Sequence, residues 1–266
     1  MTAIKAIILG IIQGLTEFLP VSSSGHLVIF QKLLKFNGPG VLFEIAVHLG
    51  TLVAVIIFFR KDIWEIIQSI FNWRKDAPKN IKYAHHLLLH LFIASVVTAI
   101  IGFAFKNTFE SLFDNTVLVG FMLIITGGVL FASDKIIRNT TKTEMSAPSS
   151  LLVGLAQSIA IIPGISRSGA TITTGIFTGR TRDLATRFSF LLSIPAILGA
   201  TLLKLKDLQS AVSSGSMGLN FILGGIFAAI VGYFAIAILI KMIKKAKLFY
   251  FAIYCWIIGI ITIFLI

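Results

Sequence analysis

A single cysteine, Cys255, occurs in the chain of 266 residues, which excludes an internal disulfide and a cysteine-rich metal site. Charged residues are also scarce: they make up 13% of this chain, whereas soluble domains average about 25%. Hydrophobic residues reach 56%, and apolar runs of about 18 residues or more recur, which is typical of transmembrane helices. The sequence therefore predicts an all-α integral membrane protein that crosses the lipid bilayer several times.

Acidic residues are few as well, with 11 against 23 Lys and Arg, and the formal net charge is +12. In a soluble protein this would suggest nucleic acid, but here the cations cluster in short loops, as the positive-inside rule expects. We therefore expect no nucleic-acid partner. The start of the chain resembles a signal peptide, but Gln13 and Glu17 interrupt its apolar run and no clean cleavage site follows, so we expect it to belong to the mature fold.

Six apolar segments are long enough to cross the bilayer: residues 41–59, 84–105, 116–133, 183–203, 218–240 and 248–266. Polar segments lie at 60–83 and 134–148. Two further segments, 2–34 and 149–181, carry Pro, Gly and Ser at their centres. Such a backbone is tolerated at membrane depth only where it is buried in protein or lines a cavity, so each is predicted to be a re-entrant helix–loop–helix hairpin.

The two hairpin segments also match each other. When the chain is shifted by 144 residues, five positions coincide: Gly10 with Gly154, Gln13 with Gln157, Ser22 with Ser166, Ser24 with Ser168, and Gly25 with Gly169. We therefore expect one membrane domain, residues 1–266, built from repeats 1–138 and 149–266. Each repeat has one hairpin, which returns to its own side, and three crossings. Because three is an odd number, the second repeat is upside down relative to the first. This is an inverted-topology repeat, with a site expected near the midplane.

Orientation follows from Lys and Arg. The loops 60–83, 134–148 and 241–247 hold 13 of these residues and the opposite side holds six. The first side is therefore predicted to face the cytoplasm. Both termini and the mouth of the first hairpin are then expected on the outer side.

Ionisable groups inside a membrane are costly and are candidates for function. Gln13 and Glu17 are four residues apart and share a helix face. Together they could bind a divalent cation or orient a polar partner, or they could form a structural hydrogen bond to the opposing hairpin.

The centres of both hairpins carry serines that would lie at the N-terminus of a half-helix, where free N–H groups and the helix dipole favour an anion. In the first hairpin, a serine beside His26 is the pattern of an activated nucleophile, although the serines could be simple caps and His26 a packed side chain. In the second hairpin, Arg167 offers a planar fork that suits phosphate oxygens, or it could form a salt bridge to Glu17. The candidate binding residues are Gln13, Ser22, Ser24, Gly25, Ser166, Ser168 and Gly169, and the candidate catalytic residues are Ser23, His26, Glu17 and Arg167.

Other polar groups are weaker candidates. Glu44 and His48, four residues apart, could border the site or simply pair at a helix interface. His86 and His90 have a spacing that suits a metal, but they are expected at a membrane boundary with His85, where a functional role is less common. The charged cluster Arg180, Arg182, Asp183 and Arg187 resembles a solvated helix start.

The sequences QGLTEFLPVSSSGH and PGISRSGAT closely resemble the two signatures of the undecaprenyl-pyrophosphate phosphatases of the bacitracin-resistance type. The resemblance extends over the chain, including FEIAVHLGTLVAV and RFSFLLSIPA. It implies hydrolysis of undecaprenyl pyrophosphate to undecaprenyl phosphate and inorganic phosphate, which recycles the carrier lipid of peptidoglycan synthesis. It also implies an inverted repeat with two re-entrant hairpins in the bacterial inner membrane, and a site that opens outward.

The same resemblance places the nucleophile on Ser23, the histidine on His26 and the phosphate-binding arginine on Arg167. It implies a dependence on Mg²⁺ or Ca²⁺ with Glu17 nearest the ion, although this chain has Gln13 where a second carboxylate can occur. The alternative from another functional class is a polyprenyl-phosphate flippase or transporter, since broken helices in inverted repeats are transporter architecture. The sequence leaves the oligomeric state open, a homodimer being one arrangement.

Overall fold

The computed structural model describes residues 2–36, 40–72, 74, 76–136, 140–204, 218–244 and 248–266. Within these ranges the chain forms helices, turns and loops, with one isolated β-bridge between Lys142 and Arg180. Some of the cations that predict the orientation, Lys75, Arg138, Lys206, Lys245 and Lys247, lie outside the described residues.

In the described part of the chain, five helices are long and apolar enough to cross a membrane: α5 (Lys79–Ala104), α7 (Thr116–Ile136), α10 (Arg182–Leu203), α12 (Leu219–Lys244) and α13 (Leu248–Leu265). A sixth candidate is α3 (Gly40–Phe58), which passes the same test together with α4 (Arg60–Phe71) across a bend of 79°. These helices coincide with the six predicted segments. Their outward faces expose large apolar side chains such as Phe92 and Phe103, as lipid contact requires.

The prediction missed two helices. The segment 60–83 was expected only as a polar stretch, but it contains α4, whose sequence RKDIWEIIQSIF alternates charged and apolar residues at helical spacing. A short α6 (Lys106–Ser111) and a 3₁₀ turn η1 (Leu112–Asp114) connect α5 to α7.

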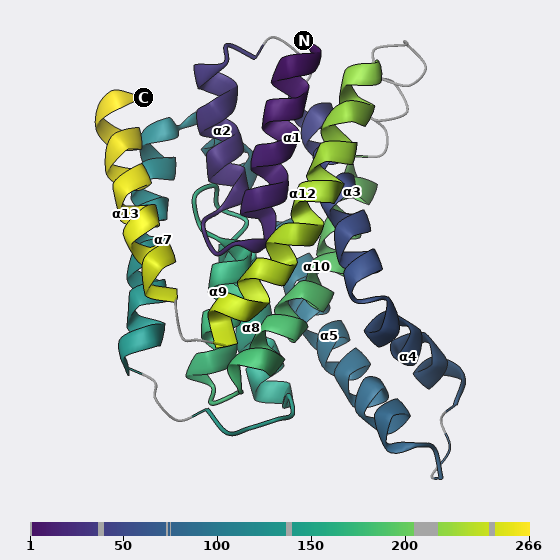
Figure 1. The fold of residues 1–266 in the computed structure, drawn as a ribbon. Coiled ribbons are helices and arrows are strands. Elements are labelled where there is room, and N and C mark those ends of the chain that lie inside the picture. The colour runs from purple at the N-terminus through teal and green to yellow at the C-terminus, as the bar shows by residue number, and fades with distance from the viewer. Residues whose placement is uncertain are drawn as a thin grey trace.

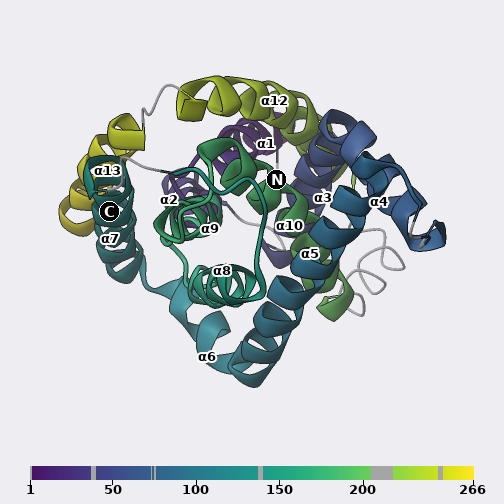
Figure 2. The ribbon, with the colours of Figure 1, turned by 90° about the horizontal axis from the view of Figure 1, so that it is seen from below.

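Each of the two remaining polar segments is a pair of short helices. The first pair is α1 (Ala3–Phe18) and α2 (Ser23–Leu33), and the second is α8 (Ala147–Ile159) and α9 (Arg167–Phe177). Figure 1 shows that the two pairs enter the molecule from opposite ends and that their connecting loops meet near the middle. Seen from below, the hairpins occupy the centre, and α3, α5, α6, α7, α12 and α13 lie around them (Figure 2).

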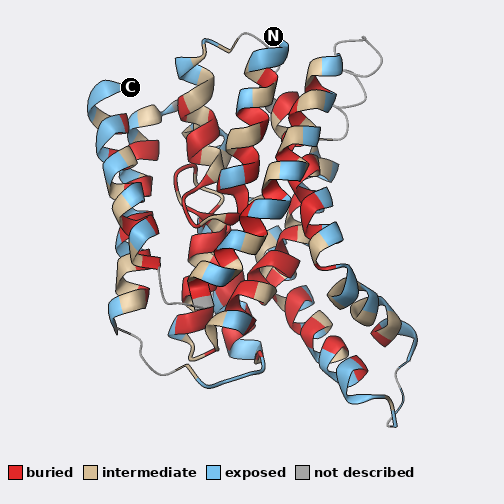
Figure 3. Cartoon of the chain, viewed as in Figure 1, coloured by how far each residue is buried: buried red, intermediate tan, exposed pale blue. Residues whose placement is uncertain are grey.

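Glycines allow the outer helices to approach the first hairpin and one another closely. An added Cβ at Gly10 of α1 would lie 2.3 Å from the carbonyl oxygen of Gly224 on α12. At Gly50 of α3 it would lie 2.1 Å from the carbonyl oxygen of Gly225. Small residues at such crossings let two backbones pack in van der Waals contact, which drives helix association inside a membrane. Buried residues are accordingly concentrated where the helices and hairpins face one another (Figure 3).

Candidate active site

The tips of the two hairpins are joined by reciprocal hydrogen bonds. The Ser22 hydroxyl donates to the carbonyl oxygen of Ile165 at 3.3 Å, and the Ser168 hydroxyl donates to the carbonyl oxygen of Leu19 at 3.1 Å. In addition, the guanidinium of Arg167 donates to the Glu17 carboxylate. The structure therefore brings residues about 150 positions apart, from both halves of the chain, into one site.

Both second helices begin in the same way. Ser22 accepts a hydrogen bond from the N–H of Gly25 at 3.3 Å, and Ser166 accepts one from the N–H of Gly169 at 3.1 Å. These serines are N-caps, so the first turns of α2 and α9 both begin at the junction of the two hairpins. Two positive helix ends at one place favour an anion.

The backbone just before Ser23 is strained. Ser22 has φ 67° and ψ 95°, which is unusual for a residue with a side chain. Strain of this kind costs on the order of 1–3 kcal/mol and persists only where surrounding contacts hold it. Here the tight turn reverses the chain from α1 into α2 and leaves the Ser23 hydroxyl facing Glu17.

Glu17 is the centre of the polar network. Its Oε2 accepts a hydrogen bond from Ser23 Oγ at 2.6 Å and another from Gln13 Nε2 at 2.8 Å, while Oε1 pairs with Arg167. His48 Nε2 on α3 lies 3.6 Å from Oε2. The carboxylate is almost fully buried, with 6% exposure. A carboxylate that accepts a hydrogen bond from a neighbouring hydroxyl is arranged to act as the base for that hydroxyl.

A cavity of about 360 Å³ opens onto this network. Its polar lining comes from α1, α2, α3, α9, α10 and the loop before α9: Glu17, Ser23, Ser24, Glu44, His48, Ser166, Arg167, Thr201 and Lys204. Glu44 and His48 therefore do border the site. The remaining lining is apolar, including Phe113, Ile161, Ile197 and Ala200. A polar end beside an apolar wall suits a lipid with a charged headgroup.

Arg167 retains binding capacity in this arrangement. Its NH2 group is engaged by Glu17, but its NH1 group is buried and has no hydrogen-bond partner. The side chain lines the cavity, so an anion bound there would lie beside a guanidinium that has an unsatisfied donor. An unsatisfied buried donor carries a free-energy cost that such a ligand would remove.

His26 lies behind the cavity wall and does not line it. Its Nδ1–H donates to the carbonyl oxygen of Ser22 at 2.8 Å, since a carbonyl can only accept, and its Nε2 then accepts from the Tyr254 hydroxyl at 2.8 Å. The two rings are stacked with centroids 5.6 Å apart. The structure thus brings His26 to the backbone of Ser22 and not to the hydroxyl of Ser23, which Glu17 engages.

A divalent cation such as Mg²⁺ requires oxygen ligands from the protein, the substrate or water. Among the described residues, no group of three or more His, Cys, Asp and Glu side chains is arranged to hold a metal. Two carboxylates, Glu17 and Glu44, nevertheless line the cavity, although each already accepts hydrogen bonds, Glu44 from Gln31 at 3.1 Å. This set fits Mg²⁺, which commonly binds one or two carboxylates together with substrate phosphates and water.

Besides Thr201, which lines the cavity, three polar residues at or behind the site were not predicted. Thr126 of α7 accepts from the N–H of Ser166 at 3.1 Å and donates to the carbonyl oxygen of Gly164 at 3.0 Å, so it holds the second loop in place. The Tyr254 hydroxyl bonds to His26, and Lys204 lines the cavity and donates to Glu110 of α6 at 2.6 Å. That hydrogen bond holds the pKa of Glu110 below its ordinary value. In the sequence, each of these three residues is a polar group inside or at the end of an apolar run. That position was the signal that could have indicated a role for them.

The other predicted polar residues lie elsewhere. His90 donates from Nδ1 to the carbonyl oxygen of His86 at 2.7 Å on α5, away from the cavity. The cluster at the start of α10 is largely paired: Arg182 with Asp134 at 2.9 Å, and Arg187 with Asp62. Arg180, 5% exposed, bonds to the carbonyl oxygen of Thr178 at 2.6 Å. It is therefore a buried structural residue and not a solvated one.

Comparisons with known proteins converge on one family. The sequence profile of the family described as Bacitracin resistance protein BacA matches residues 6–261. A protein from Halothermothrix orenii named undecaprenyl-diphosphatase is 45% identical over 266 residues, covering 100% of this chain and 98% of that protein. Proteins of the same name from Alkaliphilus metalliredigens and Syntrophotalea carbinolica are 44% and 42% identical. These alignments cover 99% and 97% of this chain and 98% and 97% of the two proteins.

Proposed function

Because the chain belongs to the bacitracin resistance protein BacA family, we propose that it is an integral membrane phosphatase acting on undecaprenyl diphosphate. It releases inorganic phosphate and leaves undecaprenyl phosphate, the carrier lipid of peptidoglycan synthesis. The observation that carries this assignment is the placement of Ser23, Glu17 and Arg167 around one cavity. A flippase needs no such set of nucleophile, base and anion-binding group.

The chemistry follows from the hydrogen bonds. Ser23 Oγ attacks the terminal phosphorus and its proton passes to Glu17 Oε2, the atom that already accepts it at 2.6 Å. The bond from phosphorus to the bridging oxygen breaks, and undecaprenyl phosphate leaves with that oxygen, which takes the proton from Glu17 and returns it to the carboxylate form. Water then attacks the phosphoserine, releases phosphate and restores the hydroxyl. The Glu17 carboxylate is placed to accept the proton of this water and to pass it to Ser23 Oγ as the phosphoserine bond breaks.

The remaining groups bind and position. The free NH1 of Arg167 and the first turns of α2 and α9 hold phosphate oxygens and offset charge as it develops in the transition state. His26 fixes the strained turn at Ser22, which aims Ser23 at Glu17. A divalent cation held by Glu17 and Glu44 together with the diphosphate would neutralise further charge.

The finer topology is part of the proposal. The matched serine caps of the two hairpins, together with their entry from opposite ends of the molecule, support an inverted repeat with two re-entrant hairpins. The distribution of Lys and Arg supports a site and two termini on the outer side of the bacterial cell membrane.

Purified protein tests the function directly. In detergent it should release phosphate from undecaprenyl diphosphate and not from undecaprenyl phosphate, and Arg167→Ala should remove most of this activity. In vesicles, a headgroup-accessibility assay measures lipid translocation in the same preparation. Translocation without phosphate release would overturn the proposal in favour of a flippase.

A further inference from the structure

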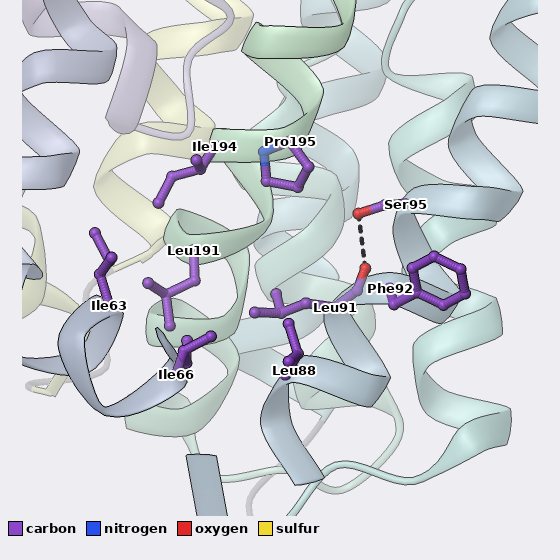
Figure 4. A pocket seen from close by; sticks show the side chains of 9 residues that line it. All are labelled: Ile63, Ile66, Leu88, Leu91, Phe92, Ser95, Leu191, Ile194 and Pro195. Carbon is purple, nitrogen blue, oxygen red and sulfur yellow. Dashed lines mark hydrogen bonds between the residues drawn. The ribbon is translucent and has the colours of Figure 1, made fainter. Parts of the chain in front are cut away.

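A second cavity lies in the described part of the chain, on the membrane-facing side of α10. This groove of about 300 Å³ is formed by three helices: α4 contributes Ile63 and Ile66, α5 contributes Leu88, Leu91, Phe92 and Ser95, and α10 contributes Leu191, Ile194 and Pro195. Figure 4 shows these side chains around the space between the helices. The 79° bend between α3 and α4 is what places α4 against this side of the molecule.

The groove has no group that could hold a polar headgroup. Its lining contains no charged side chain, and its single hydroxyl, on Ser95, donates to the carbonyl oxygen of Leu91 in its own helix at 2.7 Å. An occupant must therefore be hydrocarbon along the whole length of the groove. A polar group placed there would lose its hydration without a compensating hydrogen bond.

The groove and the catalytic cavity share helix α10. Pro195 lines the groove, while Ala196 and Ala200 line the cavity. Five residues of α-helix rise about 7 Å, so the two spaces are less than two helical turns apart. Ala200 lines the cavity and is also exposed on the surface of α10, so it lies at an edge of the cavity.

Small residues lie on the path between the two spaces. Gly199 is four residues after Pro195 and directly before Ala200, so it lies on the same helix face between groove and cavity. A Cβ at Gly199 would meet no atom within 4 Å, which shows open space there. On α5, Ala99 and Gly102 follow Ser95 on one helix face. Gly102 lies close to Ile161 of the cavity wall, because a Cβ added at Gly102 would lie 3.2 Å from Ile161 Cδ1.

We propose that the groove between α4, α5 and α10 binds the polyprenyl tail of the substrate, which leaves the catalytic cavity past Ala200 and Gly199. This inference rests on the proposed function and extends it, because it makes the groove a determinant of prenyl chain length. The diphosphate stays at the hairpin tips, and a long tail gains apolar burial in the groove that a short tail cannot reach. A membrane acyl chain is the competing occupant.

The test compares a long and a short prenyl diphosphate, undecaprenyl and farnesyl diphosphate, on the same purified protein. For Gly199→Phe, which would fill the open space, the ratio of kcat/KM for the long over the short substrate should fall about tenfold, as expected when a few methylene groups lose their pocket. Gly128→Phe on α7 is the matched control, since Gly128 also has no atom within 4 Å of an added Cβ. Its ratio should stay at the wild-type value.

Ser95→Phe, on the opposite wall of the groove, should also lower the ratio of kcat/KM for the long over the short substrate. It is the variant to measure if Gly199→Phe does not fold. A wild-type ratio in both variants would overturn the proposal and leave the groove to membrane lipid. An equal loss on both substrates in the folded variants would also overturn it, because the substitutions would then act on the headgroup. Failure of the wild-type protein to release phosphate from either substrate would instead contradict the proposed function.

Discussion

The hydroxyl of Ser23 donates its hydrogen bond to Glu17 Oε2 at 2.6 Å, although the two residues belong to different helices of the first hairpin. A break between α1 and α2, with Ser22 in a strained conformation, makes this contact possible. Arg167, from the second hairpin, binds the other oxygen of the same carboxylate. The carboxylate thus connects a nucleophile to an anion-binding group, and the predictions below follow from that arrangement.

Glu17→Gln should lower kcat for phosphate release by about 10²–10⁴-fold, the contribution typical of a general base. The amide keeps the shape of the side chain but cannot accept the proton of Ser23. Glu65→Gln on α4, whose carboxylate accepts from Asn80 at 3.1 Å, is a control that should retain wild-type activity. Normal kcat in Glu17→Gln would remove the base from the mechanism.

Arg167→Lys should lose about 10²–10³-fold in kcat/KM, because a single ammonium cannot engage Glu17 and also present a second donor to phosphate. Arg60→Lys, at an exposed position on α4, should change nothing. Steady-state phosphate release measures both. Full activity of Arg167→Lys would show that charge alone is sufficient at this position.

Tyr254→Phe should have a smaller effect. It leaves His26 Nε2 without its donor, at a cost of about 1–3 kcal/mol for a buried group. The melting temperature should fall by a few degrees, and kcat by less than tenfold, because His26 positions the Ser22 turn. Tyr233→Phe on α12 is the control for loss of a hydroxyl. A loss in Tyr254→Phe as large as that of Glu17→Gln would instead place His26 and Tyr254 on the path of the proton.

Chelation with EDTA should lower phosphate release by at least about tenfold, and added Mg²⁺ or Ca²⁺ should restore it. The melting temperature should not change, because the described residues contain no cluster of ligands that would hold the ion without substrate. Unchanged activity in EDTA would contradict a divalent cation in the reaction.

Gly10→Ala should destabilise the fold, because its Cβ would lie 2.3 Å from the carbonyl oxygen of Gly224. Overpacking of this kind costs about 1–3 kcal/mol. Gly128→Ala, with open space around it, should leave stability equal or slightly higher, since Ala is the better helix former. Thermal unfolding in detergent compares the two, and an equal effect of both substitutions would argue against the close α1–α12 contact.

Much of this arrangement could be predicted from the sequence. Hydropathy located the long helices, and Pro, Gly and Ser inside apolar runs located the breaks before Ser23 and Arg167. The pairing of Glu17 with Arg167 was one of two alternatives, and the structure shows that pairing while leaving NH1 free for a ligand. These features were predictable because polar groups in a membrane must find partners.

What the sequence could not predict depends on packing between distant segments. The pairing of His26 with Tyr254 spans 228 residues, and that of Ser166 with Thr126 spans 40. No local pattern indicates which polar group in one apolar run meets which group in another. The helix α4 was missed for a related reason: its charged residues suggested a loop, whereas its apolar face packs on the described core through Ile63 and Ile66.

The comparison of Ser23→Ala with Ser24→Ala tests the account most directly. Both serines line the cavity, but Ser24 Oγ interacts with Ser22 Oγ at 3.3 Å and only Ser23 reaches Glu17. In single-turnover phosphate release from undecaprenyl diphosphate, Ser23→Ala should lose at least about 10³-fold, while Ser24→Ala should stay within about tenfold of the wild type. Equal rates in the two variants, or near-normal release by Ser23→Ala, would contradict the assignment of Ser23 as the nucleophile.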